Sequence, residues 1–90
     1  MSHLRLDEVT PTIVSLQEQL ELWRTAEIER QRGRLGALSQ QQEEAIQAMT
    51  RGLINKIAHG PIMELRKQAV EPGGVHVMGM IRKLFRLGEG

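Results

Sequence analysis

The sequence predicts an all-α fold: a helical bundle of about four helices with one long N-terminal helix, completed by a two-fold-related partner chain. The 90 residues include one Phe, one Trp and no Tyr, and Leu, Gln, Glu and Arg are abundant, a composition that favours helices over pleated sheets. Apolar residues also recur at steps of three and four, which is the period of one helix face. A chain this short buries only roughly 60% of its unfolded surface, so we expect a partner to add to its core.

A first long helix is expected from Pro11 to about Arg34. Thr10 can cap its free backbone N–H groups, and proline at the first helical position loses no hydrogen bond. Its apolar face contains Ile13, Leu16, Leu20 and Trp23. Three ion pairs with a spacing of three residues are expected on its exposed side: Glu21 with Arg24, Glu27 with Arg30, and Glu29 with Arg32.

A second helix is expected to begin at Ser39, after a break at Gly36. Gly36 can adopt the left-handed conformation that ends a helix, and Ser39 with Gln42 has the spacing of a capping box. The apolar stripe of this helix contains Ile46, Met49, Leu53 and Ile57. Further apolar residues beside the stripe widen it, so at least two helices should pack on it.

Two shorter helices are expected to complete the chain. Gly60 and Pro61 predict the end of the second helix and the start of a third, with His59 near the last carbonyl groups. The strongest turn signal is Glu71-Pro72-Gly73-Gly74, and a last amphipathic helix should follow and end near Leu87.

Charge, cysteine content and hydropathy exclude several classes of function. The net charge is +1, whereas dedicated nucleic-acid or membrane-surface binders usually carry a clear basic excess. The absence of cysteine removes disulfides, thiolate metal sites and thiol catalysis. No apolar run approaches the roughly 18 residues of a membrane helix, and Met1 to Asp7 lacks the apolar stretch of a signal peptide. A cytoplasmic location is therefore the default expectation.

No catalytic, cofactor-binding or metal site is expected in this chain. The three histidines, His3, His59 and His76, form no metal-binding pattern, and the serines have no base nearby in the sequence. No glycine-rich loop follows a strand, as a nucleotide site would require. The basic residues gather at Arg30 to Arg34 and at Arg82 to Arg86, where they suit the negative ends of helix dipoles and could also touch phosphates.

Several stretches resemble the C-terminal dimerisation domain of bacterial and archaeal glutamyl-tRNA reductases. The most specific is Met49 to Pro61, which is similar to the family's Leu-Thr-Arg, Asn-Lys, His and Pro string, with Leu65-Arg66 following. Val9 to Leu16, Ala26 to Arg30 and Leu35 to Ser39 match other family stretches in the same order and spacing. The resemblance covers about residues 9–87 and implies residues 1–9 as a connector or a start left by cloning, and 10–88 as the dimerisation domain.

The resemblance implies a parent enzyme, an oxidoreductase that uses NADPH to convert glutamyl-tRNA to glutamate-1-semialdehyde in tetrapyrrole (porphyrin) biosynthesis. The family's cysteine nucleophile and dinucleotide-binding domain have no counterpart in this sequence. This fragment is therefore expected to be non-catalytic and to hold no cofactor. Contact of the parent with the next enzyme of the pathway is a further expectation from the resemblance.

Three functional hypotheses remain open at this point. The first is homodimerisation through Ile13, Leu16, Leu20, Trp23, Ile46, Met49, Leu53 and Ile57. The second is an RNA-binding module that contacts tRNA for glutamate weakly through Arg30, Arg32, Arg34, Arg51 and Lys56. The third is a small helical enzyme that resembles an all-helical chorismate mutase, which would need cationic residues facing a buried pocket.

Overall fold

The described part of the chain consists of three helices and contains no strand. The computed structural model describes residues 6–69 and 73–87, with side chains from residue 9 onward. Helix α1 spans Leu6–Leu35, α2 spans Gln40–Gln68 and α3 spans Gly74–Leu84. The all-α prediction is confirmed, but the expectation of about four helices is wrong because the second and third are one continuous helix.

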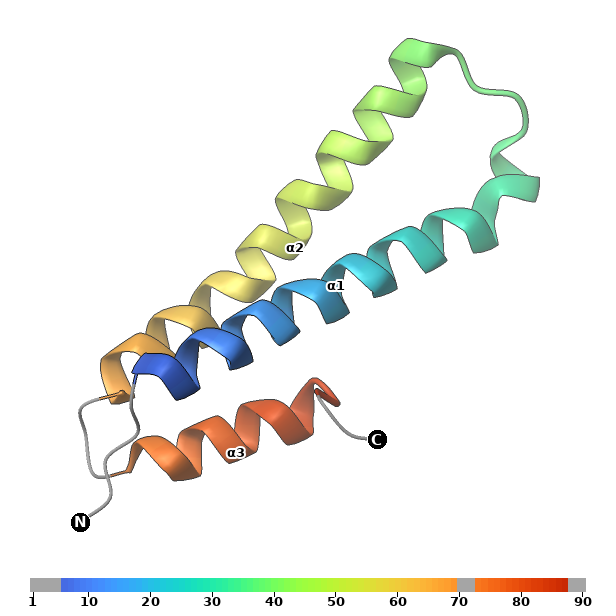
Figure 1. Ribbon diagram of the computed structural model, residues 1–90. Helices are drawn as coiled ribbons and strands as arrows, with labels where there is room; N and C mark the ends of the chain where they lie inside the picture. Colours follow the sequence, from blue (N-terminus) through green and yellow to red (C-terminus); the bar gives the residue numbers. More distant parts are fainter. Residues whose placement is uncertain (1–5, 70–72, 88–90) are drawn as a thin grey trace.

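Helices α1 and α2 form a long hairpin, and α3 packs beside one end of it (Figure 1). The two long helices diverge toward the loop that joins them, so the molecule is elongated, at 57 × 24 × 16 Å. We call the two-helix part, residues 21–57, the arm. α3 lies beside the N-terminal part of α1 and the C-terminal part of α2 and leaves the arm without a third helix.

The core lies at the end of the hairpin where all three helices meet. Leu16 and Leu65 are fully buried, and Val9 is only 1% exposed. They form one cluster with Ile13, Leu20, Ala58, Ala69, Ile81 and Leu87. Because burial of each large apolar side chain is worth roughly 1.5–3 kcal/mol, most of the packing energy of the chain is concentrated at this end.

Helix α2 continues through Gly60 and Pro61, where the sequence predicted its end. Pro61 has no N–H to donate to the carbonyl oxygen of Ile57, and a proline inside a helix usually costs about 3 kcal/mol. The buried residues on either side, Ala58 and Leu65, belong to the same core cluster. Packing of both segments against one core keeps them in a single helix, since tertiary contacts override local propensity.

Helix α1 begins at Leu6, before the predicted start at Pro11. Thr10 is therefore not the N-cap, and Pro11 lies inside the helix with its side chain exposed. Val9 is 1% exposed and belongs to the core cluster. Its burial favours a helix that extends beyond the proline at the cost of one backbone hydrogen bond.

The two ends of the loop between α1 and α2 agree with prediction. Gly36 has φ +73°, and its N–H donates to the Arg32 carbonyl oxygen at 3.1 Å. The Gln42 N–H donates to Ser39 Oγ at 3.0 Å, and the Ser39 N–H donates to Gln42 Oε1 at 2.9 Å, which completes the capping box. Of the expected turn at Glu71–Gly74, the first two residues lie outside the described part of the chain, and α3 begins at Gly74 as the turn predicted. Residues 1–5 of the expected connector also lie outside it.

Helix α3 ends in a Schellman motif built on an arginine. The Leu87 N–H donates to the Arg82 carbonyl oxygen at 2.8 Å, and the Arg86 N–H donates to that of Lys83 at 3.3 Å. Arg86 has φ 55°, a left-handed conformation that usually belongs to glycine. Leu87, which follows, is 3% exposed, so its burial holds the strained residue in place.

Arg86→Gly should stabilise the fold by about 1 kcal/mol, because glycine adopts the left-handed conformation without the steric cost that a Cβ imposes. The difference can be measured as a shift in the urea unfolding midpoint. Arg86→Ala is the matched control: it removes the same exposed side chain but keeps the Cβ, so it should not stabilise. Equal stabilisation by both variants would show that the side chain, and not the backbone conformation, is responsible.

The pH dependence of stability should carry a contribution from Glu43. Hydrogen bonds from Arg32, and then from Gln47, lower the pKa of the Glu43 carboxyl from 4.5 to about 2. A carboxyl whose pKa is lower in the folded state stabilises the fold above its unfolded pKa, and this contribution is lost as the pH falls. Urea midpoints should therefore drop between pH 4.5 and about 2.

Glu43→Gln should reduce the fall of the urea midpoint over this pH range, because the amide cannot titrate, while the other carboxyls with a lowered pKa, Glu21 and Glu27, keep their part of it. Glu44→Gln is the control, since Glu44 is exposed and accepts a hydrogen bond only from Gln40 among the described residues. The assignment to Glu43 is wrong if both variants keep the wild-type pH profile.

Candidate functional site

An apolar groove runs along the arm between α1 and α2. Its volume is about 390 Å³. Met49, Leu53 and Ile57 are 62%, 57% and 51% exposed and lie at successive steps of four along α2. The other apolar residues that line it are Ile28, Leu35, Ile46 and Ile54. The exposed apolar side chains of this groove are contiguous rather than scattered singly. Contiguous apolar patches on a protein surface usually mark interaction sites.

Arg24 lies buried between the two helices beside this groove. Its side chain is 3% exposed. Its guanidinium pairs with both oxygens of Glu21 and donates to Gln47 Oε1 at 2.6 Å and to Thr50 Oγ1 at 3.2 Å. A buried charge is tolerated only when it is paired in this way, so this cluster holds one register of α1 against α2.

The burial of Arg24 corrects the expectation that its pair with Glu21 lies on the exposed side. Arg24 comes four residues after Leu20 and eleven after Ile13, in the register of the buried face, so the periodicity of the sequence contained this signal. The hydrogen bonding of the Arg24 guanidinium to the Glu21 carboxylate lowers the pKa of Glu21 and raises the pKa of Arg24.

A second charged cluster closes the tip of the arm. Arg32 Nη1 and Nη2 donate to the two carboxylate oxygens of Glu43, both at 2.8 Å, and its Nε donates to Glu29 at 3.0 Å. The hydrogen bond that Arg32 donates to Glu43, followed by the one it donates to Glu29, raises the pKa of Arg32. Because a bidentate pair fixes the orientation of both groups, this contact ties the end of α1 to the start of α2.

The eight predicted interface residues occupy two different places. Ile13, Leu16 and Leu20 are buried in the core of their own chain. The other five are exposed or half-buried on the arm: Trp23, Ile46, Met49, Leu53 and Ile57. The structure therefore brings the α2 stripe together in one groove and separates it from the apolar residues at the start of α1.

The five predicted tRNA-contacting residues do not form one patch. Arg30 and Arg32 are ion-paired with carboxylates of α1 and α2. Arg34 lies in the last turn of α1, whereas Arg51 and Lys56 lie exposed in the middle of α2. Among the described residues, these three make no ion pair.

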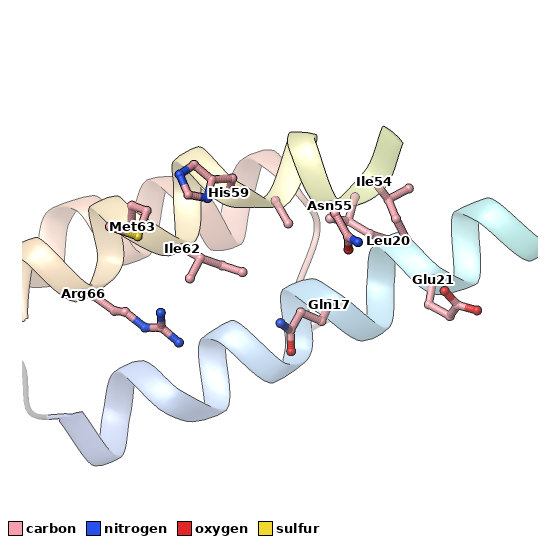
Figure 2. A pocket seen from close by; sticks show the side chains of 10 residues that line it. Gln17, Leu20, Glu21, Ile54, Asn55, His59, Ile62, Met63 and Arg66 are labelled. Carbon is pink, nitrogen blue, oxygen red and sulfur yellow. The ribbon is translucent and has the colours of Figure 1, made fainter. Parts of the chain in front are cut away.

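A groove lined by both polar and apolar side chains lies between α1 and α2 nearer the core, with a volume of about 390 Å³ (Figure 2). Gln17 and Glu21 line it from α1, and Asn55, His59 and Arg66 from α2. In Figure 2 the Arg66 and Gln17 side chains extend into the space between the helices. His59, expected to lie at a helix end, is instead an exposed residue within α2. The sequence did not predict that Gln17 and Arg66 line one groove, because this depends on how α1 packs against α2.

The part of the chain that the structure describes offers no cluster of metal-ligating side chains. No described helix is long and apolar enough to span a membrane. Arg24 is the one buried cation among these residues, and its donors are engaged by Glu21, Gln47 and Thr50. The cationic pocket that a mutase-like enzyme would need is therefore not formed by the described residues.

The sequence matches known proteins along nearly its whole length. It is 56% identical over 87 residues to a glutamyl-tRNA reductase of Solibacter usitatus, covering 97% of this chain and 21% of that protein. It is 54% identical over 86 residues to glutamyl-tRNA reductase 2 of Koribacter versatilis, covering 96% and 20%. It is 40% identical over 81 residues to a glutamyl-tRNA reductase of Trichodesmium erythraeum, covering 89% and 19%.

The chain thus spans about a fifth of the length of these relatives. No solved structure matches it. The family model described as "Glutamyl-tRNAGlu reductase, dimerisation domain" matches residues 1–87. Together with the apolar groove on an otherwise charged arm, these matches show that the chain belongs to the dimerisation-domain family of the glutamyl-tRNA reductases.

Proposed function

We propose that this chain joins two subunits of a glutamyl-tRNA reductase through the apolar groove of the arm. The observation that carries this proposal is the exposure of Met49, Leu53 and Ile57, which are each more than half exposed on one stripe of α2. Pairing would remove these side chains from water, at roughly 25 cal/mol for each Å² of apolar surface buried. Ile46 lines the same groove and would be covered with them.

The catalytic chemistry of the parent protein would lie outside this chain. The parent would use NADPH to reduce glutamyl-tRNA to glutamate-1-semialdehyde, for tetrapyrrole biosynthesis in the cytoplasm. The residues present here do not fit a dinucleotide. The glycine-rich loop that binds a dinucleotide's phosphates joins a strand to a helix, whereas α3 begins at Gly74 with no strand before it in the described residues. The sequence also has no cysteine that could act as a nucleophile.

A second candidate function, contact with tRNA, is supported by a row of polar and basic residues on α2. Arg51, Asn55, His59 and Arg66 follow one another at steps of four, four and seven, so they share one side of the helix. No Asp or Glu occurs from residue 45 to residue 63. Arg51 and Arg66 lie about 22 Å apart along the helix axis, a distance over which a nucleic-acid backbone carries several phosphates. Contact of the parent with the next enzyme of the pathway has no candidate surface among the described residues.

Pairing predicts that the 90-residue chain has about twice its 10.2 kDa mass in solution. Leu53→Glu should dissociate it, because two carboxylates would be buried without partners at the centre of the interface. Light scattering after gel filtration measures both masses. Leu20→Glu would instead disrupt the core of a single chain, because Leu20 is 4% exposed.

The control for the interface is Ala48→Glu, which places the same charge on an exposed residue of α2. Ala48 is five residues from Leu53 and lies on a different side of the helix, so this variant should remain a dimer. A wild-type monomer at micromolar concentration, or equal dissociation by both variants, would contradict the proposal.

Contact with tRNA predicts that affinity falls as salt concentration rises, because bound cations release counterions from phosphates. Filter binding of tRNA for glutamate to the chain should show this dependence, and Arg51→Gln, Lys56→Gln and Arg66→Gln should each reduce the slope of log affinity against log salt by about 1. With a net charge of +1, the affinity itself should be weak.

The matched control replaces an existing ion pair: Glu27→Gln together with Arg30→Gln leaves the net charge unchanged. Arg30 Nη2 already donates to Glu27 at 2.6 Å, so the double variant should keep the wild-type slope. A slope near zero in the wild type would exclude phosphate contacts.

A further inference from the structure

The groove shown in Figure 2 lies on the face of the hairpin opposite α3. On α1, Gln19 Nε2 donates to the carbonyl oxygen of the residue that follows α3, at 3.2 Å, and on α2 Gln68 lies against the residue before α3. Gln17 and Arg66, which line the groove, precede these two residues by two, a step that turns a helix by about 200°. Arg66 also follows Ile57 by nine residues, or about two and a half turns. Neither α3 nor a partner bound along the apolar stripe of α2 therefore covers this groove.

The floor of the groove is an apolar row that ends at a cation. Ile54, Ala58 and Ile62 follow one another at steps of four along α2, about 12 Å from the first to the last, and Arg66 takes the next place in the same row. Leu20 completes the floor from α1. Figure 2 shows the Arg66 side chain extending over the groove toward α1. The groove thus offers apolar contact along its length and a positive charge at one end.

The polar side chains around this floor are unengaged within the described part of the chain. Among these residues, no hydrogen bond or ion pair involves the side chains of Gln17, Asn55, His59 or Arg66. The carboxylate that lines the groove, Glu21, has both oxygens engaged by the buried arginine of the arm. Few polar groups placed around an apolar surface are typical of a small-molecule site, where they orient the ligand. Here the free donors suit an anion.

We propose that this groove binds a small organic carboxylate with an aliphatic body, whose charged end pairs with Arg66 and whose chain lies on the apolar floor. A guanidinium binds a carboxylate through two parallel hydrogen bonds. Gln17 extends into the same space in Figure 2 and supplies a further donor. Such a ligand differs in class from the subunit and the tRNA proposed above, and its binding depends on neither.

The shape of the groove favours an aliphatic chain over a peptide or an inorganic anion. Its volume of about 390 Å³ lies in the range of small-molecule sites, roughly 300–1,000 Å³. A peptide along the floor would bury backbone N–H and C=O groups against side chains that cannot bond them, which is unfavourable at each group. Inorganic phosphate would leave the apolar row in water. An aliphatic body about 12 Å long covers the row and places its carboxylate at the cation one turn farther along.

Titration with octanoate, followed by NMR of the isotope-labelled chain, tests this inference. At concentrations that form no micelles, octanoate should bind with a Kd in the millimolar range, as expected for a ligand of its size. The methyl resonances of Ile54 and Ile62 and the ring resonances of His59 should shift and saturate together. Acetate has the charge without the chain, and octanol has the chain without the charge, so each should bind the groove about tenfold more weakly.

Arg66→Gln removes the cation at the end of the row and should weaken octanoate binding about tenfold, because charge-assisted hydrogen bonds are lost. Lys67→Gln is the matched control. It removes the same charge from the neighbouring exposed residue, about 100° farther round the helix, and should leave the Kd unchanged. Both side chains are exposed, and helical circular dichroism verifies that both variants fold.

Equal weakening by the two variants would show attraction by net charge alone, and equal affinity for octanoate and octanol would show apolar binding without the cation. Either result overturns the inference. Shifts confined to Met49 and Leu53 on the arm, or no saturable shift in the groove, overturn it as well. None of these measurements involves tRNA or the mass of the chain in solution, so a failure here is distinguishable from a failure of the proposed function.

Discussion

The coverage of a long hairpin by a short third helix determines most features of this structure. α1 and α2 have 30 and 29 residues, whereas α3 has 11. At the covered end, apolar side chains from three helices form a compact core. Along the arm, two helices cannot enclose the apolar residues that they carry, because each helix offers the other only one face. The exposed stripe of α2 follows directly from this difference in length.

Polar contacts hold the arm together where apolar packing cannot. The Arg24 cluster joins the helices near the middle of the arm, and the Arg32 to Glu43 pair joins them at the tip. Each member of the Arg24 cluster is hydrogen-bonded, and no buried side-chain polar atom of the described residues lacks a partner. A fully satisfied network specifies one arrangement of the helices. The groove is thus formed within a single chain, and a surface that is ordered before association loses less conformational entropy when it binds.

The sequence predicted the ends of the helices better than it predicted which apolar residues are buried. The capping box at Ser39 and the left-handed Gly36 were predictable because a helix end depends on a few neighbouring residues. Pro61 misled because its effect on α2 depends on Ala58 and Leu65, which pack against residues from other helices. Periodicity also identified the apolar face of each helix but not the neighbour that covers it. Ile13 and Met49 therefore looked alike in sequence, although one is buried in its own chain and the other is exposed.

The partners of charged residues were also hard to predict where they lie on another helix. The spacing of the sequence predicted the pairs of Arg30 with Glu27 and of Arg32 with Glu29, and both form, but it did not show that Arg32 also pairs with Glu43. That pairing depends partly on the approach of α2 to the end of α1. The candidate tRNA surface consequently moved from the end of α1 toward α2 once the ion pairs were known, and Arg66 joined it from a part of the chain that sequence reasoning had assigned to a separate helix.

The two proposed surfaces can operate together because they use different sides of α2. His59 follows Ile57 by two residues, and Arg51 follows Met49 by two; a step of two residues turns a helix by about 200°. Association along the apolar stripe therefore leaves the row of Arg51, Asn55, His59 and Arg66 exposed to solvent. The stretch from Met49 to Pro61 contains most of both surfaces. Its sequence thus places apolar residues on one side of the helix and polar or basic residues on the other, and no Asp or Glu of α2 occurs between residues 45 and 63.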